Sequence, residues 1–279
     1  MVEAHPMPSP REKVSTVDPI WTALREQAQA MASREPTLAG FVHATILQHD
    51  RLEQALSYHL ARKLGGEDLS PLAIREMFDD AVAAEPGLGA AVRADLSAVF
   101  ERDPACHSYV DAFLFYKGFH ALESFRISHW LWTSNRPAMA LFLQSRISQL
   151  FAVDIHPAAR IGRGIMLDHA TGIVIGETAV VEDDVSIMQD VTLGGTGKES
   201  GDRHPKIRRG VLLSLGAKIL GNIEIGEYSR VGAGSVVLKS VPPHCTAVGV
   251  PAKLVNCDCG ERPSHQMDHF IEELPDNTG

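Results

Sequence analysis

The chain has 279 residues, of which 44% are hydrophobic and 22% charged, as in an ordinary globular protein with one large domain or two smaller ones. A formal net charge of −9 argues against nucleic-acid binding, which needs a basic face. The longest apolar run, Ala138–Leu143, is too short to cross a bilayer, and the N-terminus lacks the segments of a secretory signal. We therefore expect a cytoplasmic protein that binds neither nucleic acid nor membrane.

The four cysteines do not form a disulfide framework in a chain of this size. Cys257 and Cys259, with His265 and His269 nearby, resemble a zinc site only loosely, because zinc-binding cysteine pairs usually have two to four residues between them and this pair has one. The sequence favours a flexible polar tail over residues 256–279 and no metal site.

The first 150 residues carry helical signals after a proline-rich stretch. Residues 1–17 show no periodicity and are expected to form a flexible arm. From residue 18 on, N-cap residues, prolines and apolar spacing predict an α-helical domain over residues 18–151. Its predicted helices are Asp18–Met31, Thr37–Lys63, Ser70–Ala84, Gly89–Phe100, Tyr109–Trp132 and Pro137–Phe151.

Residues 152–255 place a branched aliphatic residue, or in one case alanine, at almost every sixth position. The phase breaks once: sixteen residues separate Val191 from Ile207, one period of six plus ten extra. The register consists of Ile155, Ile161, Leu167, Ile173, Ala179, Val185, Val191, Ile207, Leu213, Ile219, Ile225, Val231 and Val237.

A six-residue period fits neither an α-helix nor a β-strand, and it is typical of a parallel β-helix whose aliphatic residues point into a narrow core. We expect about four turns of about 18 residues, with the glycines beside the register (Gly162, Gly226 and Gly232) supplying corner conformations. The ten extra residues predict an inserted loop, and the helical domain is expected to cover the first turn.

Polar residues inside this register are the candidates for chemistry. Asp154 and His156 lie in one turn, and Asp168 and His169 in another. A carboxylate beside an imidazole fixes the imidazole tautomer and raises its basicity for removing a hydroxyl proton. For His156 a polar corner residue is the better interpretation, whereas His169 is the better candidate for a base.

Four sequence motifs stand out: Asp168-His-Ala-Thr-Gly172 and Gly201-Asp-Arg-His-Pro205 in the predicted β-helix, and Lys117-Gly-Phe-His120 and His129-Trp-Leu-Trp132 in the helical part. These motifs resemble those of serine O-acetyltransferases, the first enzymes of cysteine synthesis. The resemblance covers about residues 18–255. The predicted fold class is thus α+β, an N-terminal α-helical oligomerisation domain followed by a left-handed parallel β-helix, the catalytic domain, with an inserted loop.

The resemblance implies transfer of acetyl from acetyl-CoA to the hydroxyl of L-serine. It makes His169 the general base, with Asp154 as the partner that stabilises its imidazolium form. Backbone N–H groups around Gly195 are expected to stabilise the oxyanion.

The resemblance also assigns the groups that bind serine. Asp103 and Asp168 match the residues that bind its ammonium group, and Arg203 and His204 match those that bind its carboxylate. Cysteine would make the same contacts, so feedback inhibition by cysteine is a hypothesis.

No permanently bound cofactor is expected, and acetyl-CoA is the cosubstrate. Its phosphates need cations, for which Lys218, Lys239 and above all Lys253 are candidates. Family members usually carry glycine or alanine where this chain has Leu215, which would narrow the groove for CoA if its side chain points outward.

The resemblance implies a homotrimer, or a dimer of trimers joined through the helical domains, with each site between two subunits of a trimer. Many family members end in isoleucine, which inserts into cysteine synthase. This chain ends in Pro275-Asp-Asn-Thr-Gly279, so a complex with cysteine synthase is not expected.

Three other functions fit a β-helix. One is an acyltransferase with a sugar, homoserine or dipicolinate-type acceptor, which would not explain two acids opposite Arg203 and His204. Another is a γ-type carbonic anhydrase with His156, His169 and His204 on a metal, although their spacing does not match that family. The third is a non-catalytic regulatory scaffold.

Overall fold

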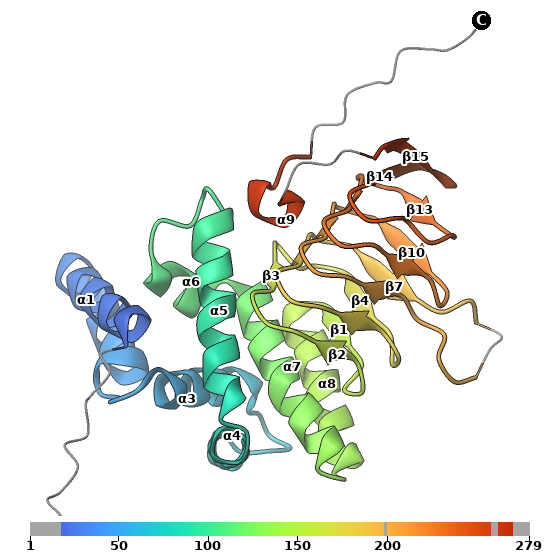
Figure 1. Cartoon of the computed structure of the whole chain (residues 1–279). Helices are drawn as coiled ribbons and strands as arrows, with labels where there is room; N and C mark the ends of the chain where they lie inside the picture. Colours follow the sequence, from blue (N-terminus) through green and yellow to red (C-terminus); the bar gives the residue numbers. More distant parts are fainter. Residues whose placement is uncertain (1–17, 198–199, 258–261, 270–279) are drawn as a thin grey trace, which may run out of the picture.

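The computed structural model describes residues 18–197, 200–257 and 262–269 and places a helical part beside a parallel β-helix (Figure 1). The arm expected over residues 1–17 lies outside the described residues. Within the described ranges, no helix has the length and apolar character needed to span a membrane. One hydrophobic core runs through both parts, from Trp21 to Ala247.

The helical part begins where the sequence predicts. Asp18 caps the first helix by accepting a hydrogen bond from the Trp21 N–H, and Ser70 caps another by accepting one from Ala73. The elements are α1 (Pro19–Arg34), α2 (Pro36–Val42), the π-helix η1 (His43–Leu47), α3 (Leu52–Leu64), α4 (Pro71–Ala84), α5 (Gly87–Arg102), α6 (Tyr109–Phe115), α7 (Lys117–Thr133) and α8 (Pro137–Phe151).

The single helix predicted over Thr37–Lys63 is wrong, because the chain breaks between η1 and α3. Two side chains of α1 donate hydrogen bonds to backbone carbonyl groups at this break. The Trp21 indole donates to the Asp50 carbonyl at 2.9 Å, and the Arg25 guanidinium donates to the His49 carbonyl. These tertiary contacts stabilise a turn that local spacing does not reveal.

The helix predicted over Tyr109–Trp132 is also two helices, α6 and α7, separated at Tyr116. Just after this break α7 approaches the β-helix closely. A Cβ atom at Gly118 would lie 2.0 Å from the carbonyl oxygen of Leu167, so only glycine fits at this contact. The Lys117 ammonium also donates to the Thr171 hydroxyl, so the start of α7 borders the turn that carries Asp168 and His169.

The β-helix prediction is confirmed, with about five turns rather than four. Sheet A has the order β1-β4-β7-β10-β13, sheet B β11-β8-β5-β2, and sheet C β15-β14-β12-β9-β6-β3; β15 alone pairs antiparallel among these strands. The strands are β1 (Val153–Ile155), β2 (Arg160–Ile161), β3 (Met166–Leu167), β4 (Ile173–Ile175), β5 (Val180–Val181), β6 (Ser186–Ile187), β7 (Thr192–Gly194), β8 (Lys206–Ile207), β9 (Leu212–Leu213), β10 (Lys218–Leu220), β11 (Glu224–Ile225), β12 (Arg230–Val231), β13 (Val236–Val237), β14 (Thr246–Gly249) and β15 (Ala252–Asn256).

The register breaks twice, not once. Val153 pairs with Ile173, so the first turn is 20 residues long, whereas Lys218 and Val236 pair at a spacing of 18. The two extra residues of the first turn fall between β3 and β4, where the Asp168–Gly172 string lies, and the remaining eight form the predicted loop between β7 and β8. The sequence hides the first break because Ile173 and Ile175 are both aliphatic and both buried.

The role predicted for the glycines beside the register is wrong. None of Gly162, Gly226 and Gly232 has a positive φ. At Gly162 the requirement is for space, because a Cβ atom there would lie 2.8 Å from the backbone nitrogen of Asp183 in the next turn. Several left-handed corners are occupied by other residue types, including His169 (φ 52°) and His244 (φ 56°). The glycines thus allow close packing between turns.

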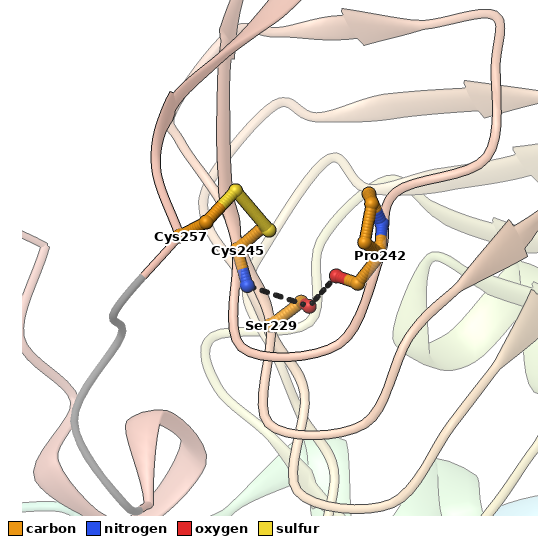
Figure 2. Close-up of a disulfide and its surroundings, with 4 residues drawn as sticks. All are labelled: Ser229, Pro242, Cys245 and Cys257. Carbon is orange, nitrogen blue, oxygen red and sulfur yellow. Dashed lines mark hydrogen bonds between the residues drawn. A yellow bond between two sulfur atoms is a disulfide. The ribbon is translucent and has the colours of Figure 1, made fainter.

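A disulfide joins Cys245 to Cys257, against the expectation that none forms (Figure 2). The antiparallel return of β15, which was not predicted, brings Cys257 back beside the last turn. The Cys245 N–H donates to the Ser229 hydroxyl, which donates to the Pro242 carbonyl at 2.7 Å. Cys257 of the loosely zinc-like group is in the disulfide, and Cys259 lies outside the described residues. Among the described residues, no three histidine, cysteine, aspartate or glutamate side chains are grouped so that they could hold a metal ion.

The flexible tail predicted over residues 256–279 is wrong for residues 262–269. Helix α9 (Pro263–Gln266) packs between the end of α5 and the β-helix (Figure 1), and Ser264 is fully buried. The Ser186 hydroxyl donates to the Ser264 carbonyl at 2.8 Å. Residues 258–261 and 270–279 lie outside the described residues, including the chain end on which the expectation about cysteine synthase depends.

A buried charge cluster joins α5 and α7 to the first turn of the β-helix. Asp95, which is fully buried, accepts hydrogen bonds from the Arg126 guanidinium at 3.0 Å and from the Ile165 N–H at 2.8 Å. Arg126 also donates to the Gly162 carbonyl at 2.7 Å. Burial raises the pKa of Glu123 well above its usual range and the charge of Asp95 raises it further, although Arg126, 3.5 Å away, opposes this.

Candidate active site

Asp103, Asp168 and His169 lie together at the edge where the chain passes from sheet C to sheet A, called edge CA. Asp103 ends α5, and Asp168 and His169 follow β3. Burial raises the pKa of Asp168 and Asp103 raises it further, although His169 opposes this. The His169 Nε2 atom is 3.9 Å from the Asp168 carboxylate, and the His169 side chain is 72% exposed. Two acids and an accessible imidazole form an acidic half-site.

Arg203 and His204 lie at a different edge, where the chain passes from sheet A to sheet B, called edge AB. The Arg203 guanidinium binds the Glu177 carboxylate at 2.7 Å, and the His204 Nδ1 atom is 2.9 Å from the Thr178 hydroxyl. A Cβ at Gly176 would lie 2.0 Å from the His204 ring, which therefore packs on glycine. Burial lowers the pKa of His204 and Arg203 lowers it further.

Within one protomer the structure does not bring these two half-sites together. Edge CA precedes β4 and edge AB follows it, and a strand of three residues spans about 10 Å. The charged groups of one amino acid are only two bonds apart, so Asp168 and Arg203 of the same protomer cannot both bind it.

Asp154 lies on sheet A, in the middle of β1, and its carboxylate accepts a hydrogen bond from the Gln144 amide at 2.7 Å. The Gly172 N–H donates to the Ala152 carbonyl, which places β1 beside the turn that carries His169. Among the hydrogen bonds and ion pairs of the described residues, none joins Asp154 to His169. The expected Asp154–His169 pair is therefore not formed. The two residues also lie in the same turn of the β-helix, the first, and not in two different turns as expected from the sequence.

The residues expected to bind CoA are spread over the β-helix. Leu215 is at edge CA and is 41% exposed, so its side chain points outward. Gly195 follows β7 at edge AB, beside Arg203, and Lys253 lies in β15 at the end of the β-helix. Lys218 is paired with Asp190 at 2.9 Å.

His156 behaves as a polar corner residue, as the sequence favours. Its Nδ1 atom accepts a hydrogen bond from the Ala158 N–H, and its ring meets the edge of Trp132 at 5.1 Å between centroids. His156 and His204 share edge AB, whereas His169 lies at edge CA.

Sequence reasoning missed the tail as part of this region. His269 hydrogen-bonds to the Ser214 hydroxyl at 3.0 Å, and its charge affects the pKa of Asp168. No local signal in the sequence indicates this contact, because it depends on how α9 packs against α5 and β9.

Known proteins are similar to this chain in sequence and in fold over about 90% of its length. Residues 20–124 match the family profile described as serine acetyltransferase, N-terminal. The chain is 58% identical over 252 residues to a serine acetyltransferase of Salmonella typhimurium, covering 90% of this chain and 92% of that protein. The crystal structure of serine acetyltransferase from Vibrio cholerae matches with a TM-score of 0.89 and 56% identity, covering 90% of this chain and 98% of that one. A serine acetyltransferase from Brucella abortus in complex with coenzyme A matches with a TM-score of 0.86 and 52% identity, covering 87% and 97%. The chain belongs to the serine acetyltransferase family.

Proposed function

We propose that the protein transfers the acetyl group of acetyl-CoA to the hydroxyl of L-serine, giving O-acetyl-L-serine and CoA, the first step of cysteine biosynthesis from serine. The observation that carries this proposal is the division of the charged residues between two edges of sheet A. Asp103 and Asp168 suit a substrate ammonium group, and Arg203 and His204 suit a carboxylate. An acceptor without both charges, such as a sugar, would leave one half-site unused.

His169 acts as the general base. It removes the hydroxyl proton of serine as the oxygen attacks the thioester carbonyl, and the tetrahedral intermediate then expels the CoA thiolate, which takes that proton from His169. Asp154 turns from Gln144 to the imidazolium as it forms, and backbone N–H groups near Gly195 stabilise the oxyanion. No permanently bound cofactor is required.

Each active site combines edge CA of one protomer with edge AB of the next, in a homotrimer. The outward face of sheet A supports this assembly, because Val174 and Leu238 are 39% and 52% exposed there. The helical parts join two trimers, and the enzyme works in the cytoplasm. Cysteine, which carries the same ammonium and carboxylate groups as serine, competes for the site.

Acetyl-CoA binds along edge CA, where Leu215 narrows the groove and Lys253 meets a phosphate. The coenzyme A complex of the Brucella abortus relative supports a cosubstrate of this kind.

Release of the CoA thiol from acetyl-CoA tests the reaction. We expect release that depends on L-serine, continues in the presence of a metal chelator and is accompanied by O-acetyl-L-serine in the mass spectrum. L-Homoserine and sugars serve as control acceptors. Release with a sugar but not with serine would contradict the acceptor assignment, and no release with any of these acceptors would leave only a scaffold role.

A further inference from the structure

Arg102, the last residue of α5, has an unusual environment for an arginine. Its side chain is 2% exposed, yet its nearest carboxylate, that of Asp184, is 3.7 Å away. One guanidinium nitrogen donates to the Ser186 hydroxyl at 3.1 Å, and Nε has no hydrogen-bond partner. A buried charge with so little compensation is costly, so its hydrogen bonds must contribute to holding the surrounding segments.

The second guanidinium nitrogen reaches the C-terminal segment. It lies 3.3 Å from Nε2 of His265, and burial, followed by the charge of Arg102, lowers the pKa of His265, which favours the neutral imidazole as acceptor. Ser186, which accepts from Arg102, donates in turn to the Ser264 carbonyl. Arg102 therefore joins three segments that are distant in sequence: the end of α5, strand β6 and helix α9.

Residues 262–269 of the C-terminal segment pack against the outer face of sheet C. Leu212 precedes the inward-facing Leu213 in β9, and it is fully buried because α9 packs on that strand. Farther on, the Arg230 guanidinium donates to the Asp268 carbonyl at 2.8 Å, and His269 binds Ser214. The outward residue Val174 of sheet A, by contrast, is 39% exposed.

Asp103 follows Arg102 directly. Its N–H donates to the Val99 carbonyl at 3.0 Å and its carboxylate accepts from the Ala105 N–H at 2.8 Å, so its position follows that of the end of α5. We infer that Arg102 is a positioning residue for the substrate ammonium group. Arg102 connects the end of α5 to the docked segment 262–269, so the position of Asp103 relative to Asp168 depends on that segment. This inference rests on the proposed function.

Arg102→Met removes the contacts while keeping much of the buried volume. We expect the KM for L-serine to rise roughly tenfold, the effect of losing one charge-assisted hydrogen bond, with the KM for acetyl-CoA unchanged. His265→Leu, at a less buried position, should raise the serine KM in the same direction. The double variant should be no worse than Arg102→Met alone, because both act through one contact.

Arg93→Met is the matched control on the same helix. Arg93 pairs with Asp18 and Glu53, so its loss should lower stability without changing the KM for serine. A wild-type serine KM for Arg102→Met, or additive effects in the double variant, would overturn the inference.

Amide hydrogen exchange gives a readout without substrate. In Arg102→Met the amides of residues 262–269 should exchange faster, while those of α1 stay protected. Unchanged exchange in this segment would overturn the link between Arg102 and α9. If the wild-type enzyme fails to acetylate serine but exchange rises in the variant, the proposed function fails while the structural link stands.

Discussion

His169→Ala is expected to lower turnover by about 10²–10⁴-fold, the usual contribution of a general base. The His169 side chain is 72% exposed, and its ion-pair contact is with Asp168 at 3.9 Å, so the substitution removes a proton acceptor without opening a cavity in the core. The oligomer and the affinity for acetyl-CoA should stay as in the wild type. Steady-state release of the CoA thiol measures the loss, and gel filtration with light scattering measures the assembly.

His244→Ala is the matched control for this substitution. His244 also occupies a corner of the β-helix with a left-handed backbone, φ 56° against 52° for His169, and it stacks on Tyr228 away from both half-sites. Alanine meets the same backbone strain at both positions. Near wild-type turnover in His169→Ala, or an equal loss in His244→Ala, would exclude His169 as the base.

Asp95→Asn is expected to lower the free energy of unfolding by about 3–5 kcal/mol, the usual effect of leaving a buried charge without its partner. Asp95 is fully buried between Arg126 and the Ile165 N–H, and the asparagine amide cannot neutralise the guanidinium. Because the cluster joins α5 and α7 to the first turn, far-UV dichroism and tryptophan fluorescence should report one shifted transition in urea.

Glu123→Gln provides the control within the same cluster. Burial raises the pKa of Glu123 well above the usual range, and its carboxyl lies 3.5 Å from Arg126, farther than that of Asp95, so a neutral amide should replace it at a smaller cost. We expect a change of less than about 1 kcal/mol. Equal destabilisation by the two substitutions would mean that packing, and not the Asp95–Arg126 pair, holds this junction.

The β-helix could be predicted because its core is narrow and is lined by aliphatic residues that recur about every six positions. Most inward positions are aliphatic, and the thirteen register residues lie inside as expected, Ile161 alone of them partly exposed. The phase could not be fixed, since positions two residues apart, such as Ile173 and Ile175, both point inward and both accept aliphatic residues. A two-residue insertion thus left no trace in the period, although it forms the turn that carries His169.

In the helical part, local signals predicted most helices, including α8 at Pro137–Phe151, but not the breaks within the two longest predicted helices. Asp18 and Ser70 act locally, within three residues of their partners, and the sequence reveals them. The break before α3 is stabilised by Trp21 and the start of α7 packs on Leu167, and both partners are remote in sequence. The same holds for the tail: Arg102 and Ser186 fix α9, and nothing within residues 262–269 indicates those partners.

The resemblance identified the residue types of the candidate site and implied a site between two subunits, but it did not show at which edges of the β-helix these residues lie within one protomer. The strings around His169 and Arg203 predict a base and an anion-binding group, whereas the structure places them at opposite edges of sheet A. In one protomer the two groups of residues are therefore separated by the width of sheet A. The sequence motifs do not show this separation.

We expect each active site to combine His169 of one protomer with Arg203 of the next. Co-expression of His169→Ala and Arg203→Ala chains with different tags, followed by two affinity steps, isolates mixed oligomers. Each variant alone should show almost no L-serine-dependent CoA release, while random mixed oligomers should regain activity at roughly a quarter of their sites, because two variants combine without defect in one of four pairings. Mixed oligomers as inactive as the two parents would contradict the claim.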